Sequence, residues 1–263
     1  METNQYVIDF YNSIDEDSRL ADSKHGTVEF LTTMRYIEKY IRQGDRVLEI
    51  GAATGRYSHT LARQGYTVDA VELVEHNIEV FRKNTLPDEK ITVIQGNALD
   101  LSAFPDNQYD ITLLLGPLYH LYNDEDKRQA LSEAIRVTKQ GGIIFAAYVI
   151  SDGCLFNDFR QGKHSVADYI KNGSLDPVTF ETTSEPKDLF ELVRKEKIDK
   201  LMTAFPTTRL HYVATDGCAP ILNDAIDNMD NDTFDLYLRY HFATCEREDL
   251  LGITTHSLDI FRK

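Results

Sequence analysis

The sequence holds few cysteines. Among its 263 residues only Cys154, Cys218 and Cys245 are cysteine, they lie far apart, and none forms a C-x-x-C pair. This number and spacing exclude a disulfide framework and argue against a zinc site, so we expect no structural metal. Free thiols are typical of a reducing compartment, and we therefore expect a cytoplasmic protein.

Basic residues are also scarce. Lys and Arg number 28 against 43 Asp and Glu, which gives a net charge of −15 and an isoelectric point near 4.9. Proteins that bind nucleic acid or anionic membranes commonly present a basic surface, and no basic cluster occurs here. The composition therefore disfavours both kinds of partner. It contains no signal for an oligomeric state.

Long apolar runs are missing as well. No stretch approaches the roughly 18 apolar residues of a membrane-spanning helix, and the first residues, METNQYVIDF, lack the apolar segment of a signal peptide. Apolar residues still make up 42% of the chain, enough for a sizeable core. We expect a globular protein without a membrane span or a leader.

Apolar strands alternate with amphipathic helices up to residue 150. Apolar runs predict strands at 46–50, 67–73, 91–95, 109–115 and 143–150. Between and before them, helical spacing predicts helices at 28–41, 57–64, 75–83 and 124–138. Such alternation is typical of an α/β fold with a parallel sheet and helices on both faces.

The alternation stops after residue 150. Residues 151–186 carry loop signals around one short predicted helix at 166–171, and long connections of this kind are commonly functional. We therefore expect a cap insertion at 151–186. Further helices are predicted at 187–202 and within 219–247, and strands at 209–214 and 254–261.

A turn rich in small residues follows the first predicted strand. In the segment VLEIGAATG it contains Glu49, Gly51, Ala53 and Gly55. Small residues let the backbone approach a ligand, and the helix N-terminus that follows offers unpaired N–H groups. A dinucleotide fingerprint would need its third glycine where this chain has Arg56. The spacing therefore disfavours an NAD-type oxidoreductase.

The turn resembles motif I, E/D-x-G-x-G-x-G, of the class I S-adenosylmethionine-dependent methyltransferases of the small-molecule type, with Ala53 in the middle glycine's place. The resemblance implies a Rossmann-like, doubly wound, seven-stranded sheet of order 3-2-1-4-5-7-6 with the last strand antiparallel. It implies one domain over 1–263, with an N-terminal lid at 1–26, a cofactor-binding core at 45–150, the cap insertion at 151–186 and a C-terminal part at 187–263. The implied cofactor is S-adenosyl-L-methionine, and the implied product is S-adenosyl-L-homocysteine.

Other strand ends carry candidate cofactor contacts. Glu72 ends the second predicted strand, where a carboxylate can accept hydrogen bonds from both ribose hydroxyls. By resemblance, the loop after the third strand holds adenine, and Asn97 stands there in the place of the usual acid, followed by Ala98. The cofactor residues we expect are Glu49, Gly51, Ala53, Gly55, Tyr57, Glu72, Leu73, Asn97, Ala98, Leu115 and Gly116.

The segment LLGPLYHL places Tyr119 and His120 at the carboxyl end of the fourth predicted strand, where α/β sheets bind ligands. Tyr119 can line the sulfonium, and His120 can act as a general base because imidazole titrates near neutral pH. A structural histidine is the alternative. The resemblance also makes Tyr11, Arg19 and Glu29 candidate lid or substrate contacts, against the alternative of surface helix residues.

Two other histidines, His211 and His241, are interpreted as packing or surface residues. Three functions stay open at this point. The first is a methyltransferase acting on a small molecule by in-line displacement, the second an NAD-type oxidoreductase, and the third a non-catalytic protein that binds S-adenosylmethionine.

Overall fold

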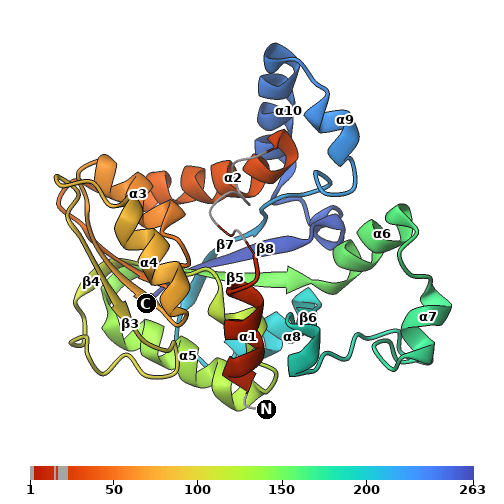
Figure 1. Ribbon diagram of the computed structural model, residues 1–263, viewed down its shortest axis with the longest axis horizontal. Helices are drawn as coiled ribbons and strands as arrows, with labels where there is room; N and C mark the ends of the chain where they lie inside the picture. Colours follow the sequence, from red (N-terminus) through yellow and green to blue (C-terminus); the bar gives the residue numbers. More distant parts are fainter. Residues whose placement is uncertain (1–2, 15, 17–22) are drawn as a thin grey trace.

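Eight strands form one sheet in the computed structural model, which describes residues 3–14, 16 and 23–263 (Figure 1). Seven of them follow the order β3-β2-β1-β4-β5-β8-β7, and β8 runs antiparallel to both neighbours. The predicted fold class and strand order are confirmed. These strands are β1 (Arg46–Ile50), β2 (Thr67–Glu72), β3 (Ile91–Gln95), β4 (Tyr109–Leu114), β5 (Thr138–Ile150), β7 (Thr208–Ala214) and β8 (His256–Arg262).

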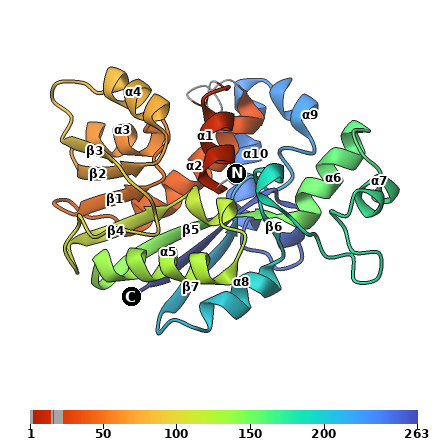
Figure 2. The same cartoon turned by 60° about the horizontal axis from the view of Figure 1, so that its bottom comes forward.

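Successive side chains of each central strand point to opposite faces of the sheet and enter two separate cores. On β1, Val47 packs toward α2 (Lys24–Tyr40) and α3 (Arg56–Arg63). Its neighbour Leu48 packs toward α5 (Asp124–Val137) and α8 (Lys195–Met202), which cover the other face (Figure 2). Burial on both faces explains why these strands are continuously apolar in sequence.

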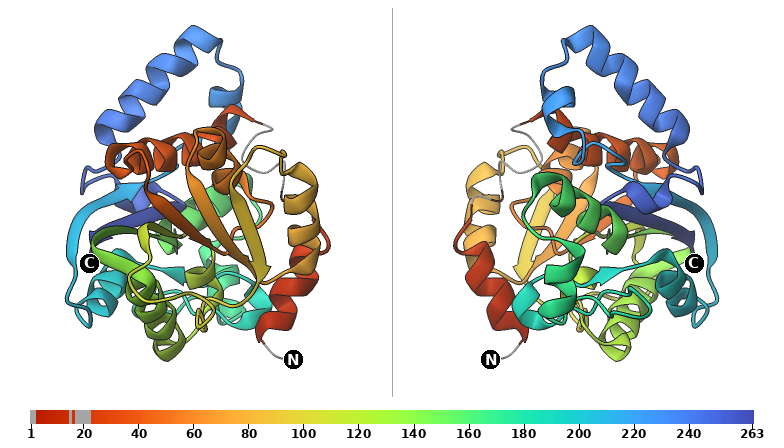
Figure 3. Two further views of the ribbon diagram at one scale, coloured as in Figure 1. Left: turned by 90° about the vertical axis from the view of Figure 1, so that its left-hand side faces the viewer. Right: turned by 90° about the vertical axis from the view of Figure 1, so that its right-hand side faces the viewer.

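The helix α4 (Glu75–Asn84) packs through Phe81 against Ala70 of β2. Farther along the chain, α9 (Asn223–Asp227) and α10 (Asn231–Thr244) lie on the side of α2 that faces away from the sheet (Figure 3). A small apolar cluster that includes Val28 of α2 and Phe234 of α10 joins them. Among the described helices, none is long and apolar enough to cross a membrane.

The strand β5 begins earlier than the sequence pattern indicates. It starts at Thr138, directly after α5, and not at residue 143. Gly141 lies inside the strand, with φ +79°. The pairing with β4 shifts in register between Tyr109 and Ile111. A glycine in the left-handed region is typical of a β-bulge, which bends a strand without ending it.

Two predictions between residues 151 and 202 are wrong. The loop signals at 151–161 lie within a helix, α6 (Ser151–Gln161), which precedes the correctly predicted α7 (Val166–Lys171). The predicted helix at 187–202 begins only at Lys195. Before it come the 3-10 turn η2 (Pro186–Asp188) and a short strand, β6 (Leu192–Val193), which pairs with the end of β5. Strand pairing outweighed local helix preference here.

A close contact with another part of the backbone explains why a glycine, Gly153, lies inside α6. A Cβ atom at this position would lie 1.9 Å from the carbonyl oxygen of Thr254, so α6 touches the backbone that leads into β8. The contact anchors α6 and α7, which extend away from the sheet on the side opposite α3 and α4 (Figure 1).

We expect Gly153→Ala to destabilise the fold by about 1–3 kcal/mol, because α6 must move away from the Thr254 carbonyl to admit the methyl group. Urea unfolding at pH 7 measures the change. Gly252→Ala is the matched control, since nothing lies within 4 Å of a Cβ at Gly252 on the neighbouring turn η3 (Leu251–Ile253). Equal stability of the two variants would contradict the close contact.

Candidate active site

A cavity of about 1260 Å³, including its opening to solvent, lies at the carboxyl ends of the parallel strands. The first helix, α1 (Thr3–Tyr11), borders it through Asn4, Val7 and Tyr11. Most of the residues selected from the sequence meet here, namely Tyr11, Glu29, Glu49, Gly51, Ala53, Tyr57, Glu72, Leu73, Asn97, Ala98, Leu115, Gly116, Tyr119 and His120.

Some of the residues selected from the sequence are not among those that line the cavity. Gly55 lies just behind it as the N-cap of α3. Arg19 lies outside the described residues. No described residue of the predicted cap insertion at 151–186 lines the cavity, whereas α1, which lies in the predicted N-terminal lid at 1–26, borders it. His211 and His241 also lie away from it, in agreement with their interpretation as packing or surface residues.

The glycine turn depends on left-handed backbone conformations. Gly51 has φ +75° and Gly55 has φ +90°, and Ala53 between them has φ +47°, which is uncommon for a residue with a side chain. A Cβ at Gly51 would lie 2.7 Å from the Pro117 ring, and one at Gly55 would lie 2.5 Å from the Phe81 ring. Glycine is therefore required at both ends of the turn.

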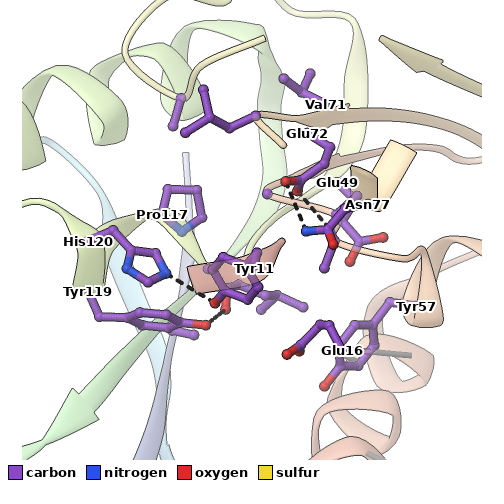
Figure 4. A pocket seen from close by; sticks show the side chains of 18 of the residues that line it. Tyr11, Glu16, Glu49, Tyr57, Val71, Glu72, Asn77, Pro117, Tyr119 and His120 are labelled. Atoms are coloured by element: carbon purple, nitrogen blue, oxygen red, sulfur yellow. Dashed lines mark hydrogen bonds between the residues drawn. The ribbon is translucent and has the colours of Figure 1, made fainter. Parts of the chain in front are cut away.

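Glu72 joins this turn to β2. Its Oε2 accepts a hydrogen bond of 2.8 Å from the backbone amide of Ala53, and its Oε1 accepts one of 2.9 Å from the backbone amide of Val74. Oε1 also accepts a hydrogen bond of 3.3 Å from the side-chain amide of Asn77 (Figure 4). Burial outweighs these hydrogen bonds and raises the pKa of Glu72. The carboxyl group thus holds Ala53 in its left-handed conformation, and it borders the cavity beside the turn.

Glu49 lies deeper, beneath the N-terminus of α3. It accepts hydrogen bonds from the amide of Ser58, at 2.9 Å, and from the Ser58 hydroxyl. Burial, together with the nearby Glu72, raises the pKa of Glu49 to about 8. A cation in the cavity would favour the ionised form, so this carboxyl group is suited to a positively charged ligand.

The side chain of Asn97 also shapes its own loop. Its Oδ1 accepts a hydrogen bond of 3.0 Å from the Leu99 amide, which is an Asx turn. The carboxamide therefore has a structural role and also lines the cavity, next to Ala98.

His120 links three segments. Its Nδ1 donates to the carbonyl oxygen of Leu189 at 2.8 Å, so Nε2 accepts from the hydroxyl of Tyr11, 3.2 Å away (Figure 4). Burial lowers the pKa of His120 to about 4. The neighbouring Tyr119 donates its hydroxyl to the Leu115 carbonyl at 3.0 Å. His120 is thus a neutral imidazole that holds α1 against the segment after η2.

Several lining residues escaped the sequence analysis, among them Thr33, Arg56, Asn77, Thr215 and His256. The guanidinium of Arg56 lies 4.7 Å from the Phe30 ring centroid, beside the glycine turn. Thr215 directly follows the predicted strand at 209–214, and that strand-end position was an available signal. The signal for His256 was indirect, because an antiparallel last strand, as the resemblance implied, brings its first residues to the cavity.

Part of this site lies in a segment that is similar to known proteins. Residues 48–146 match the family model described as a methyltransferase domain. A demethylmenaquinone methyltransferase of Clavibacter sepedonicus is 35% identical over 102 residues, which are 38% of this chain and 40% of that protein. An S-adenosyl-L-methionine-dependent Diels-Alderase of Talaromyces variabilis is 30% identical over 38% of this chain and 34% of that protein. The chain thus spans less than half the length of these relatives.

The overall fold is also similar to that of a solved structure. A SAM-dependent methyltransferase from Methanosarcina mazei superimposes with a TM-score of 0.57 at 17% identity, over 87% of this chain and 96% of that one. This likeness concerns the fold alone. The predicted resemblance to class I S-adenosylmethionine-dependent methyltransferases is therefore confirmed: residues 48–146 match a methyltransferase domain, and the fold is similar to that of a SAM-dependent methyltransferase.

Proposed function

We propose that this protein is an S-adenosylmethionine-dependent methyltransferase that acts on a small-molecule acceptor. The observation that carries the proposal is the meeting of Glu72 with the left-handed glycine turn at the edge of one cavity. That cavity lies within the matched domain on the cofactor side and extends beyond it toward β7 and β8.

The residues of the cofactor side fit the proposed cofactor. Gly116 faces Gly51 with enough space for a ligand, since a Cβ there would meet only the Gly51 oxygen at 3.5 Å and the Tyr119 hydroxyl at 3.7 Å. The carboxyl oxygens of Glu72 suit the ribose hydroxyls, and Asn97 and Ala98 would border adenine. When bound, the sulfonium supplies the methyl group, whose bond to sulfur breaks as the bond to the acceptor forms.

The other half of the cavity would hold the acceptor. Helix α1 borders it through Tyr11, and α2 borders it through Glu29 and Thr33. Thr215, which follows β7, and Leu258 of β8 complete this half. This half lies outside residues 48–146, so the acceptors named for the relatives do not carry over to this chain. Enclosure by α1 would exclude water and orient the acceptor for in-line attack.

We propose that the main role of His120 is to position α1 and Leu189 at the site. Its low pKa makes it a weak base at neutral pH, and both ring nitrogens take part in hydrogen bonds that hold α1 and Leu189 at the site. Tyr119 would border the reacting centre from the same 3-10 turn, η1 (Pro117–His120).

A second candidate is a protein that binds S-adenosylmethionine without transferring its methyl group. One observation favours it, namely the relative named as a Diels-Alderase, whose similarity covers 38% of this chain. An NAD-type oxidoreductase fits less well, because the long side chain of Arg56 begins α3 where the dinucleotide fingerprint needs glycine.

Calorimetric titration of the purified protein with S-adenosylmethionine, S-adenosylhomocysteine and NADH tests the cofactor. We expect micromolar binding of the first two and none of NADH. A screen of phenols, small amines and thiols with labelled cofactor then tests turnover. Binding without any methylated product would favour the second candidate, and binding of NADH alone would overturn the assignment.

Substitution of Glu72 tests the ribose contact. Glu72→Gln keeps the size of the side chain but removes its charge, and we expect it to weaken cofactor binding by about 1–3 kcal/mol. Glu72→Ala should weaken it further, because the Ala53 and Val74 amides lose their acceptor. Glu75→Gln, an exposed acid on α4, is the matched control. Affinity equal to that of the control would remove Glu72 from the site.

His120 should make the fold sensitive to acid. Because its folded-state pKa of about 4 lies below its ordinary value of 6.5, the unfolded chain binds more protons between these values. Its contribution to stability is therefore complete above pH 6.5 and is lost as pH falls toward 4. Between pH 7 and pH 5 we expect the wild type to lose about 2 kcal/mol more than His120→Asn in urea unfolding. Parallel pH dependences would refute the buried, neutral imidazole.

A further inference from the structure

A histidine and an aspartate meet at the acceptor side of the cavity. Asp216 follows the end of β7, and His256 begins β8. Because β8 runs antiparallel to β7, the end of one strand lies beside the start of the other. The two residues are 40 positions apart in sequence, yet both lie at the edge of the sheet where ligands bind in this fold.

The contact between them is direct. The Nδ1 atom of His256 lies 2.9 Å from Oδ2 of Asp216 and 3.6 Å from Oε2 of Glu29 on α2. The Asp216 side chain is buried, whereas 27% of the His256 side chain is exposed, and His256 lines the cavity. The ring is therefore within reach of a ligand, while the carboxylate behind it is shielded from one.

The surroundings of Asp216 keep it ionised. Burial alone would raise its pKa, but hydrogen bonds from His256 and from the hydroxyls of Thr254 and Thr255 outweigh burial and lower it. The Thr255 and His256 amides also donate to Asp216, at 2.9 and 3.2 Å. An ionised Asp216 keeps the proton on Nδ1 of His256, so Nε2 carries the lone pair of the neutral ring.

Further titratable groups surround this pair. Glu29 faces His256 from α2, and Cys154 of α6 together with Tyr237 and His241 of α10 are close enough to interact electrostatically with Asp216. Burial lowers the pKa of His241, which does not line the cavity. Of the histidines in the described chain, His256 is the one that lines the cavity with a buried carboxylate behind it.

We propose that His256 is the general base that takes a proton from the methyl acceptor, and that Asp216 is a positioning residue that holds the Nδ1 proton. The inference rests on the proposed methyltransferase function and assigns the deprotonation step to β8, away from His120. It also defines the acceptor class as a molecule whose nucleophilic oxygen or nitrogen carries a proton at neutral pH.

The proton balance of this step is simple. Nε2 of His256 takes the proton from the acceptor, and the electron pair left on the oxygen or nitrogen forms the bond to the methyl carbon. The bond from that carbon to sulfur breaks at the same time, and its electron pair stays on the sulfur of S-adenosylhomocysteine, the leaving group. His256 is then a cation between Glu29 and Asp216, two carboxyl groups that stabilise positive charge. The cation returns its proton to solvent after the methylated product leaves.

The same three side chains also have the spacing of a cation site. Their ligand atoms lie within 4.8 Å of one another. The Asp216 oxygens are, however, already engaged by the hydroxyl and amide groups described above, which suits a hydrogen-bonded dyad better than a metal ligand. A metal ion is therefore treated as an alternative outcome of the test.

The test compares wild type, His256→Gln, Asp216→Asn and His25→Gln, with acceptors taken from the screen of phenols, amines and thiols. His25→Gln is the matched control, because His25 also pairs with an aspartate, Asp227, at 2.7 Å but lies away from the cavity. Calorimetry should give the same S-adenosylmethionine affinity for all four proteins. For phenols that are un-ionised at pH 7, we expect kcat of His256→Gln to fall by roughly 100-fold or more.

Two readouts distinguish a base from a structural residue. The loss of rate in His256→Gln should shrink as more acidic phenols are used, because these acceptors arrive already deprotonated. In ¹⁵N spectra of the protein without ligand, the proton of the His256 ring should lie on Nδ1 in the wild type and should redistribute to Nε2 in Asp216→Asn. The His25→Gln control should match the wild type in both measurements.

The outcomes separate the two proposals. A wild-type protein that turns over while His256→Gln keeps the wild-type rate for every phenol would overturn the dyad and leave the methyltransferase function intact. An equal loss of rate for all phenols, or activity that depends on added Mg²⁺ and disappears with EDTA, would likewise overturn it. Absence of any methylated product in the wild type would overturn both.

Discussion

The candidate site depends on the hydrogen bond between the Glu72 carboxyl group and the Ala53 amide. Ala53 occupies a backbone conformation that costs energy for a residue with a side chain, and the turn retains it because Glu72 accepts its N–H. The parallel pairing of β1 with β2 brings the two residues together. This hydrogen bond therefore ties the conformation of the turn to β2. It also requires that the carboxyl group of Glu72 be buried at the edge of the ligand site.

The cavity has two sides of different origin. The side with Glu72 and the glycine turn comes from consecutive βα units, whose local order along the chain is shared with many methyltransferases. The acceptor side is assembled from α1, α2 and the antiparallel pair β7 and β8, which are distant in sequence. The match to a methyltransferase domain ends at residue 146, and this division explains why the comparisons leave the acceptor open.

Prediction from the sequence succeeded where the structure of a segment depends on its own residues and their neighbours along the chain. Apolar strands buried on both faces gave a clear pattern, and the strand order followed from the family resemblance. It was wrong where tertiary contacts outweighed local preference. The glycine at 141 bends β5 and does not end it, and Gly153 lies inside α6 because it touches the Thr254 backbone. Pairing with β5 made a strand of Leu192 and Val193 in a segment with a helical pattern.

The α/β alternation, the glycine turn and the acid that ends β2 could be predicted from the amino-acid sequence, because these features arise from neighbours along the chain. The protonation of His120 depends instead on the folded protein, since burial beneath Leu189 and Tyr11 lowers the pKa of this histidine. The pairing of Asp216 with His256 likewise exists only in the folded protein. Contacts between residues 40 positions apart depend on how β7 and β8 return through the sheet, and no local pattern of side chains records that path.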